Sequence, residues 1–254
     1  MPEILEVEMY RRAAELVVGR SVRSFQTNDE IVVRDGPQIQ SLVGSCVQEI
    51  GRHGKLMTIH LADGSIDLHF GMAGRIIVDG RSPIDELVYG ASSNVRWIRF
   101  GIEFDEGFLA ITDPRRFSRV GMSQKTSALG PDAFSEGLFE LVQTRLPSKG
   151  SIKGVLLNQN VVAGLGNMLV DEILSRSAVD PRRDISSLSG PKIRKVFGAI
   201  DVILPELLER GGSHMGDLAA DLRVPGSRCP YDGHELARGT IAGRTTYWCP
   251  HHQK

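Results

Sequence analysis

The chain has 254 residues, a formal net charge of −1 at pH 7, 41% hydrophobic residues and 24% charged residues. This composition is typical of a folded globular protein and excludes a disordered or fibrous one. It also excludes a surface coated in positive charge, so any contact with a polyanion must be local. The acidic N-terminus and the lack of a long apolar run predict a cytoplasmic protein without a membrane segment.

The first half is predicted to be rich in β-structure. A helix is expected over residues 3–18, ended by Gly19. From about residue 43 apolar and polar residues alternate, and LMTIHL and SIDLHF flank a predicted hairpin turn at Asp63-Gly64. VRWIRF, GIEF and FLAIT continue this alternation, which favours a sandwich or barrel. The predicted helix has these apolar residues at helical spacing: Leu5, Met9, Ala13, Leu16 and Val17.

The second half is predicted to be helical and to end in a small hairpin. Ser151 and Ser189 are expected N-caps. The fold class is therefore α+β, with a β-rich domain over 1–124, a helical domain over 125–222 and a Cys/His hairpin over 223–254. Helical spacing is found in four segments: 134–146, 151–158, 167–176 and 189–209.

The C-terminal hairpin carries a candidate metal site. Two corners, Cys229-Pro-Tyr-Asp232 and Cys249-Pro-His-His252, are separated by sixteen residues. Thiolate, imidazole and carboxylate all bind zinc, so these four residues predict a structural zinc site. His234 or His251 are alternatives to Asp232. The competing interpretation is a metal-free hairpin packed on its aromatic residues, and Cys46 is expected to be an inert core thiol.

Two loops could contact a phosphodiester chain. Gly164-Leu165-Gly166-Asn167 lies between two predicted helices, where backbone N–H groups can hold a phosphate and Asn167 adds a donor. Asp113-Pro-Arg-Arg-Phe117 follows the FLAIT strand, and its Arg115 and Phe117 could enter a base stack. Taken singly, each motif is better explained as an ordinary turn.

The N-terminus places a secondary amine beside a carboxylate. An α-amino group titrates near pH 8, so roughly a tenth of it is the nucleophilic free base at neutral pH. Pro2, next to Glu3, is therefore a candidate Schiff-base former once Met1 has been removed. Proline at the start of a helix is the alternative reading.

In this order the motifs resemble the formamidopyrimidine-DNA glycosylase and endonuclease VIII family. MPEILEVE is similar to its N-terminus, and GRHGKLM and LHFGMAG are similar to its lysine and His/Met loops. DPRRF resembles its intercalation loop, LNQNVVAGLGNMLVDEIL its helix-two-turn-helix signature, and GRTTYWCP its zinc-finger hairpin. The resemblance spans nearly the whole chain.

The resemblance implies an N-terminal β-sandwich with flanking helices, a helix-two-turn-helix domain and a zinc-ribbon hairpin. It implies a monomer that acts on double-stranded DNA with a damaged base or an abasic site, at the nucleoid. Pro2 would be the nucleophile and Glu3 the acid, with Glu6 in support and Lys55 in the same catalytic set. Phosphates would be held by Lys55, His69, Asn167 and Arg244. The space left by the extruded base would be filled by Met72, Arg115 and Phe117.

Three departures from the family pattern are visible. Leu5 replaces the usual proline, Asp232 and His252 replace two zinc cysteines, and only sixteen residues separate Gly212 from Cys229. The family's oxidised-guanine enzymes carry a longer segment there, so oxidised guanine is expected to be a poor substrate. The alternative functions are a catalytically weak or inactive relative that binds distorted DNA, and a zinc-ribbon scaffold for protein partners.

Overall fold

The computed structural model describes residues 2–84, 95–123 and 129–254. The chain folds into two compact units. The N-terminal unit comprises Pro2 and residues 6–127, and the C-terminal unit comprises residues 3–5 and 128–254. The first helix begins at Ile4, so its first two residues belong to the C-terminal unit and the rest to the N-terminal unit.

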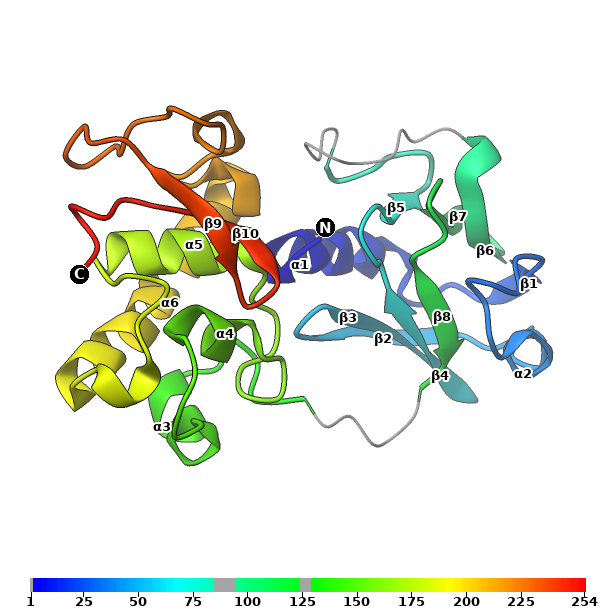
Figure 1. Cartoon of the computed structure of the whole chain (residues 1–254). Helices are drawn as coiled ribbons and strands as arrows, with labels where there is room; N and C mark the ends of the chain where they lie inside the picture. Colours follow the sequence, from blue (N-terminus) through cyan, green and yellow to red (C-terminus); the bar gives the residue numbers. More distant parts are fainter. Residues whose placement is uncertain (1, 85–94, 124–128) are drawn as a thin grey trace. The chain divides into compact units, whose positions relative to one another are not determined.

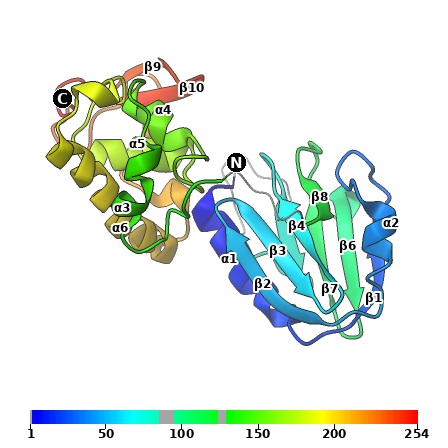
Figure 2. The same ribbon diagram turned by 90° about the horizontal axis from the view of Figure 1, so that it is seen from below.

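Two four-stranded antiparallel sheets form the N-terminal unit, and Figure 2 shows them as two layers. The first sheet has the order β1 (Val22–Gln26), β6 (Ile98–Phe104), β7 (Phe108–Thr112) and β5 (Arg75–Val78). The second has the order β2 (Val47–His53), β3 (Leu56–Leu61), β4 (Gly64–His69) and β8 (Arg119–Met122). Apolar residues from both sheets share one buried core, which confirms the expected sandwich.

The predicted β-hairpin is present, with Leu61 paired to Gly64 across its turn. VRWIRF is only partly a strand, because Val95–Trp97 forms a short 3-10 helix (η2) before β6 begins at Ile98. Cys46 is half-buried rather than a core thiol. Its sulfur lies 3.7 Å from the Val47 carbonyl oxygen.

The helices of the N-terminal unit are α1 (Ile4–Ala14), continued by the 3-10 turn η1 (Glu15–Val17), and α2 (Gly36–Gln40). The helix expected over residues 3–18 is therefore present but shorter. Leu16, assigned to its apolar face, is 66% exposed because the helix tightens before that residue. Gly19 follows with a φ of 88°, the left-handed conformation suited to ending a helix.

The C-terminal unit consists of helices and a two-stranded hairpin that lies beside α5 (Figure 1). Its α-helices are α3 (Leu138–Val142), α4 (Ile152–Leu157), α5 (Asn167–Arg176) and α6 (Gly190–Arg210). Its 3-10 helices are η3 (Gln143–Arg145), η4 (Ile185–Ser187), η5 (Ser213–Met215) and η6 (Ala220–Leu222). The hairpin strands are β9 (Ala237–Ile241) and β10 (Arg244–Trp248).

Three of the four predicted C-terminal helices are found near their expected bounds. The helix expected over 134–146 is wrong in its first part, because Gly137 has a φ of 64° and α3 begins only after it. Ser151 caps α4 by accepting a hydrogen bond from the Gly154 N–H, as predicted. Ser189 precedes α6, but its side chain makes no capping bond.

The observed α+β architecture confirms the expected fold class. The division into three domains at residues 124 and 222 stays a prediction. Among the described residues, no helix is both long enough and apolar enough to cross a membrane.

Candidate active site and metal centre

Glu3 is fixed at the start of α5. Its carboxylate accepts hydrogen bonds from the N–H groups of Gly166 (2.9 Å), Met168 (2.9 Å) and Leu169 (3.2 Å). The side chain is only 2% exposed. Free N–H groups and the positive end of the helix dipole both attract an anion, so this helix start holds the carboxylate in one orientation.

The two glycines of the Gly164-Leu165-Gly166 turn are required by close contacts. A Cβ atom on Gly166 would overlap the carboxyl group of Glu3, and one on Gly164 would overlap Ile4. Gly164 also has a φ of 111°. Three N–H groups at this helix start, those of residues 166, 168 and 169, are bound to Glu3 and so are not available to a phosphate. A phosphate contact of Asn167 stays a prediction.

Asn167 and Arg244 are brought to the same part of the C-terminal unit. The Asn167 side-chain amide donates a 2.9 Å hydrogen bond to the carbonyl of Thr245, the neighbour of Arg244 on β10. Among the residues that the structure describes, the buried Asn167 side-chain oxygen has no hydrogen-bond partner. Arg244 is exposed at the start of β10. The two predicted phosphate ligands therefore flank one edge of the hairpin.

A buried ionic network, which the sequence analysis missed, connects α4, α5 and β10. The Lys153 ammonium is fully buried and lies 2.6 Å from Asp171 and 2.7 Å from the Thr246 hydroxyl. Arg223 contacts the other Asp171 oxygen at 2.6 Å. Burial lowers the pKa of Lys153, while the negative charges of Asp171 and Glu3 oppose that shift. The sequence feature that could have indicated this network is a single lysine inside the otherwise apolar helix IKGVLL.

Glu172 holds the short segment that follows α6. Its carboxylate is buried and accepts hydrogen bonds from the backbone N–H groups of Asp217 and Leu218, both at 2.9 Å. Arg176 contacts the same carboxylate at 2.6 Å. The segment between Gly212 and Cys229 is therefore tied to α5 at Asp217 and Leu218.

In the N-terminal unit, Lys55 and His69 lie beside each other at the β2–β3 turn and the end of β4. Leu56, next to Lys55, pairs with His69. The His69 Nδ1 accepts a 3.1 Å hydrogen bond from the Gly71 N–H, so the neutral ring carries its proton on Nε2. Desolvation by surrounding atoms, then the charges of Lys55 and Arg119, lower the pKa of His69.

The predicted intercalating residues lie on two loops that pack against each other. Gly71 has no room for a Cβ atom because the Phe117 backbone lies against it. The Ser118 hydroxyl, in turn, lies 3.3 Å from the Phe70 carbonyl. Met72 and Phe117 are each 43% exposed. The two loops therefore present apolar tips together.

Asp113 organises the second of these loops. Its buried carboxylate accepts hydrogen bonds from the N–H groups of Arg115 (2.9 Å), Phe117 (2.8 Å) and Ser118 (2.7 Å). The Arg115 guanidinium lies over the Phe117 ring, 4.7 Å from its centroid. Arg116 instead turns to Asp29, with 2.9 Å between nitrogen and oxygen. The two neighbouring arginines of this loop therefore have different partners, Phe117 for Arg115 and Asp29 for Arg116.

Pro2 and Glu6 are both buried. Glu6 is fully enclosed near Tyr10, whose pKa is raised first by burial and then by the Glu6 charge. The Tyr10 hydroxyl donates a 3.3 Å hydrogen bond to the Gly74 carbonyl. Tyr10 therefore contacts the loop that contains Met72.

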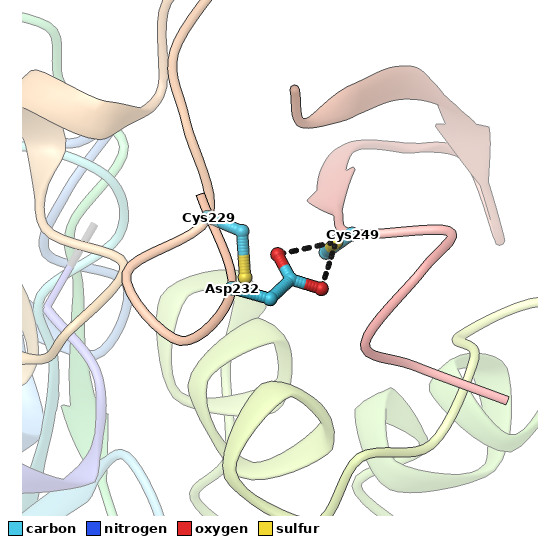
Figure 3. Close-up of side chains that lie close together, drawn as sticks. All are labelled: Cys229, Asp232 and Cys249. Atoms are coloured by element: carbon cyan, nitrogen blue, oxygen red, sulfur yellow. Dashed lines mark hydrogen bonds between the residues drawn. The ribbon is translucent and has the colours of Figure 1, made fainter. Parts of the chain in front are cut away.

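Three predicted metal ligands lie together in the hairpin. Ligand atoms of Cys229, Asp232 and Cys249 lie within 4.8 Å of one another. Figure 3 shows the Asp232 carboxylate directed at Cys249, whose sulfur is 3.4 and 3.5 Å from its two oxygens. In a tetrahedral zinc site a sulfur and an oxygen ligand are about 3.6 Å apart, so these side chains fit zinc. Burial raises the pKa of the Cys229 thiol to about 11.

The fourth predicted ligand, His252, is not in this group. Its Nε2 lies 2.9 Å from the Ser175 carbonyl oxygen, and its ring stacks on Tyr231 with 4.5 Å between centroids. His234 and His251, the two alternatives to Asp232, instead form a second group with that residue. Asp232 is therefore shared by both groups.

The chain is similar to known proteins over nearly its whole length. Residues 1–120 match the formamidopyrimidine-DNA glycosylase N-terminal domain, and residues 129–218 match the formamidopyrimidine-DNA glycosylase H2TH domain. A formamidopyrimidine-DNA glycosylase of Bacillus cereus is 32% identical, with 98% of each chain covered. One of Solibacter usitatus is 28% identical over the full length of both chains.

Solved structures of the same kind are similar over the whole of both chains. A Lactococcus lactis enzyme in complex with DNA containing an oxidised pyrimidine has a TM-score of 0.83 at 27% identity. A MutM structure in complex with DNA containing carbocyclic 8-oxo-G has a TM-score of 0.82 at 27% identity. The fold and its helix-two-turn-helix segment define the DNA glycosylase class. Within it, the chain belongs to the formamidopyrimidine-DNA glycosylase and endonuclease VIII family.

Proposed function

We propose that the protein is a base excision repair enzyme that removes a damaged base from double-stranded DNA and then cleaves the abasic site. The observation that carries this proposal is the fixed position of Glu3, the residue directly after Pro2. Its carboxylate is held by three backbone N–H groups at the start of α5. Removal of Met1 would turn Pro2 into a secondary amine beside that carboxylate. The solved relatives bound to damaged or abasic-site DNA support the same substrate class.

Proline chemistry accounts for both steps. The Pro2 nitrogen attacks the sugar C1′, and the damaged base leaves with the electrons of its bond. Glu3 takes the proton from the new ammonium and delivers it to the ring oxygen as the C1′–O4′ bond opens, which leaves an iminium ion. Loss of a C2′ proton then expels the 3′ phosphate. A second elimination, with loss of a C4′ proton, expels the 5′ phosphate, and water releases Pro2. Glu6 supports this site from its buried position.

The DNA contacts are assigned to side chains on both units. Lys55 and His69 on one unit, with Asn167 and Arg244 on the other, are proposed to hold the phosphates around the extruded nucleotide. The neutral His69 ring can donate from Nε2, because Nδ1 is occupied by Gly71. The place of the extruded base would be filled by Met72, Arg115 and Phe117.

A structural zinc ion is the proposed cofactor, with Cys229, Asp232 and Cys249 among its ligands. When bound, zinc would fix the corners of the hairpin that carries Arg244 and take no part in bond breaking. We assign the protein to the cytoplasm, acting at the nucleoid.

Oxidised guanine is proposed to be a poor substrate. The connection from Gly212 to Cys229 is short, and Glu172 ties it to α5 through Asp217 and Leu218. We therefore expect an abasic duplex to be cleaved much faster than one with oxidised guanine. Single-turnover gel assays on matched duplexes measure both rates, and equal rates would refute the proposal that oxidised guanine is a poor substrate.

Borohydride trapping on a duplex with one abasic site tests the chemistry. Wild-type protein, with Met1 removal confirmed by mass, is expected to form a covalent adduct. Pro2→Gly should trap less and Glu3→Gln should turn over slowly. Glu30→Gln changes an exposed carboxylate of the N-terminal unit and should behave as wild type. No adduct from processed wild-type protein would instead support the non-cutting relative that binds distorted DNA.

A further inference from the structure

The hairpin contains two overlapping groups of ligand atoms that meet at one carboxylate. Cys229, Asp232 and Cys249 form the inner group, in which both cysteines are buried. Asp232, His234 and His251 form the outer group, in which both histidines are exposed. The inner group supplies three donors of a tetrahedral ion, so one further donor is required.

His251 reaches the shared carboxylate. Its Nδ1 lies 2.8 Å from the Asp232 Oδ2. Oxygen and nitrogen ligands of one tetrahedral zinc ion are about 3.4 Å apart, so the Asp232 and His251 atoms already lie close to the separation that a shared ion requires. His251 lies outside the inner group, so its ring must also turn toward the two cysteine sulfurs to bind the same ion. The His251 side chain is 62% exposed, which leaves its ring room to turn.

His252 is held by other contacts. Its Nε2 faces the Ser175 carbonyl on α5, and its ring stacks on Tyr231. Its backbone N–H lies 3.3 Å from the Cys249 sulfur. Among the residues that the structure describes, it belongs to neither ligand group. These contacts suit a residue that anchors the hairpin on α5.

We propose that the metal ion is bound by Cys229, Asp232, Cys249 and His251, one position before the histidine that the spacing of the corners indicates. His252 is a positioning residue that fixes the corner. His234 stacks on His251, with 3.8 Å between ring centroids, and holds that ring without binding the ion. This ligand assignment rests on the proposed zinc, and it places one ligand at the surface.

Matched His→Phe variants of the full chain, stripped of metal and titrated with Co²⁺, test the assignment. Phenylalanine keeps a ring at each position and removes both nitrogen atoms. Wild type should bind one Co²⁺ per chain with the visible absorption of a tetrahedral site. We expect His251→Phe to weaken binding by on the order of 100-fold or more and to change that spectrum. His252→Phe and His234→Phe should keep the spectrum, with losses of at most roughly tenfold.

The reverse order, or an equal loss in His251→Phe and either other variant, would overturn the assignment. Should His252→Phe fail to fold, NMR of the wild-type protein loaded with ¹¹³Cd²⁺ identifies the histidine ligand directly. Coupling from the metal to the His251 ring is expected, and coupling to the His252 or His234 ring would contradict it. Absence of any metal binding by the wild type would refute the zinc itself. None of these readouts involves DNA, so failure of the repair chemistry is measured separately.

Discussion

The contact between Glu3 and Gly166 shows why single atoms matter at this site. The three N–H donors can reach the carboxylate only because residue 166 has no side chain. The same start of α5 therefore demands a glycine for a packing reason, in addition to any flexibility it provides.

Gly166→Ala should consequently damage both stability and chemistry. The added methyl group would displace Glu3, and we expect a loss of about 1–3 kcal/mol in the free energy of unfolding, together with slow borohydride trapping. Gly198→Ala is the matched control, because that glycine lies in α6 with open space around it. There alanine should be neutral or stabilising by up to about 1 kcal/mol. Equal effects of the two substitutions in urea unfolding would contradict the packing argument.

At the scale of elements, buried charges join segments that are distant in sequence. Lys153 on α4 meets Asp171 on α5 and Thr246 on β10, and Arg223 completes the pairing of the aspartate. Desolvation makes such a network costly unless every charge is paired. It therefore orients the helix that holds Glu3 relative to the strand that carries Arg244.

Lys153→Met should leave a buried Asp171 charge with only Arg223 as its ionic partner. We expect a loss of about 3–5 kcal/mol in the free energy of unfolding, measured by urea denaturation. Lys195→Met replaces an exposed lysine of α6 and should cost little. A loss below 1 kcal/mol for Lys153→Met would show that the network carries no net stability.

Helix α1 is linked to β2 through Glu8, which contacts Arg11, Arg12 and Arg52. Burial alone would raise the pKa of Glu8, but hydrogen bonds from the three arginines lower it from 4.5 to about 2. Because the folded state prefers the ionised form, this stabilisation is fully present above pH 4.5. It is lost as the pH falls from about 4.5 to about 2.

Glu8→Gln should therefore cost on the order of 2 kcal/mol at neutral pH and flatten the acid side of the stability curve. Unfolding by urea at a series of pH values measures both effects. Glu15→Gln serves as the control, since that carboxylate also contacts Arg11 but is 53% exposed. Its effect should stay below about 1 kcal/mol. A parallel pH dependence in wild type and Glu8→Gln would rule out the linkage.

At the scale of the whole molecule, net charge and DNA binding are separate quantities. The chain carries a net charge of −1, so DNA affinity must come from a few local cations, and Lys55 and Arg244 are the ones we propose. Each phosphate contact releases condensed counterions, and the affinity then falls with salt in proportion to the number of contacts.

Lys55→Ala and Arg244→Ala should each reduce the slope of log affinity against log salt concentration by about 0.9. Arg194→Ala removes a cation that is paired with Glu140 and should leave the slope unchanged. Fluorescence anisotropy on an uncleavable abasic analogue duplex gives these slopes. A wild-type affinity that is independent of salt would argue against the assigned phosphate contacts.

The sequence by itself determined the α+β class, the β3–β4 hairpin, the helix starts at residues 152, 167 and 190, and the pairing of Cys229 with Cys249. These features follow from periodicity, capping residues and short spacings, which are local properties of the chain. Tertiary structure alone decided that Glu3 occupies the N–H groups at the start of α5, that Lys153 is buried, and that His251 rather than His252 faces Asp232. Those outcomes depend on contacts between residues far apart in sequence, where competition for the same donor or the same space decides which partner is bound.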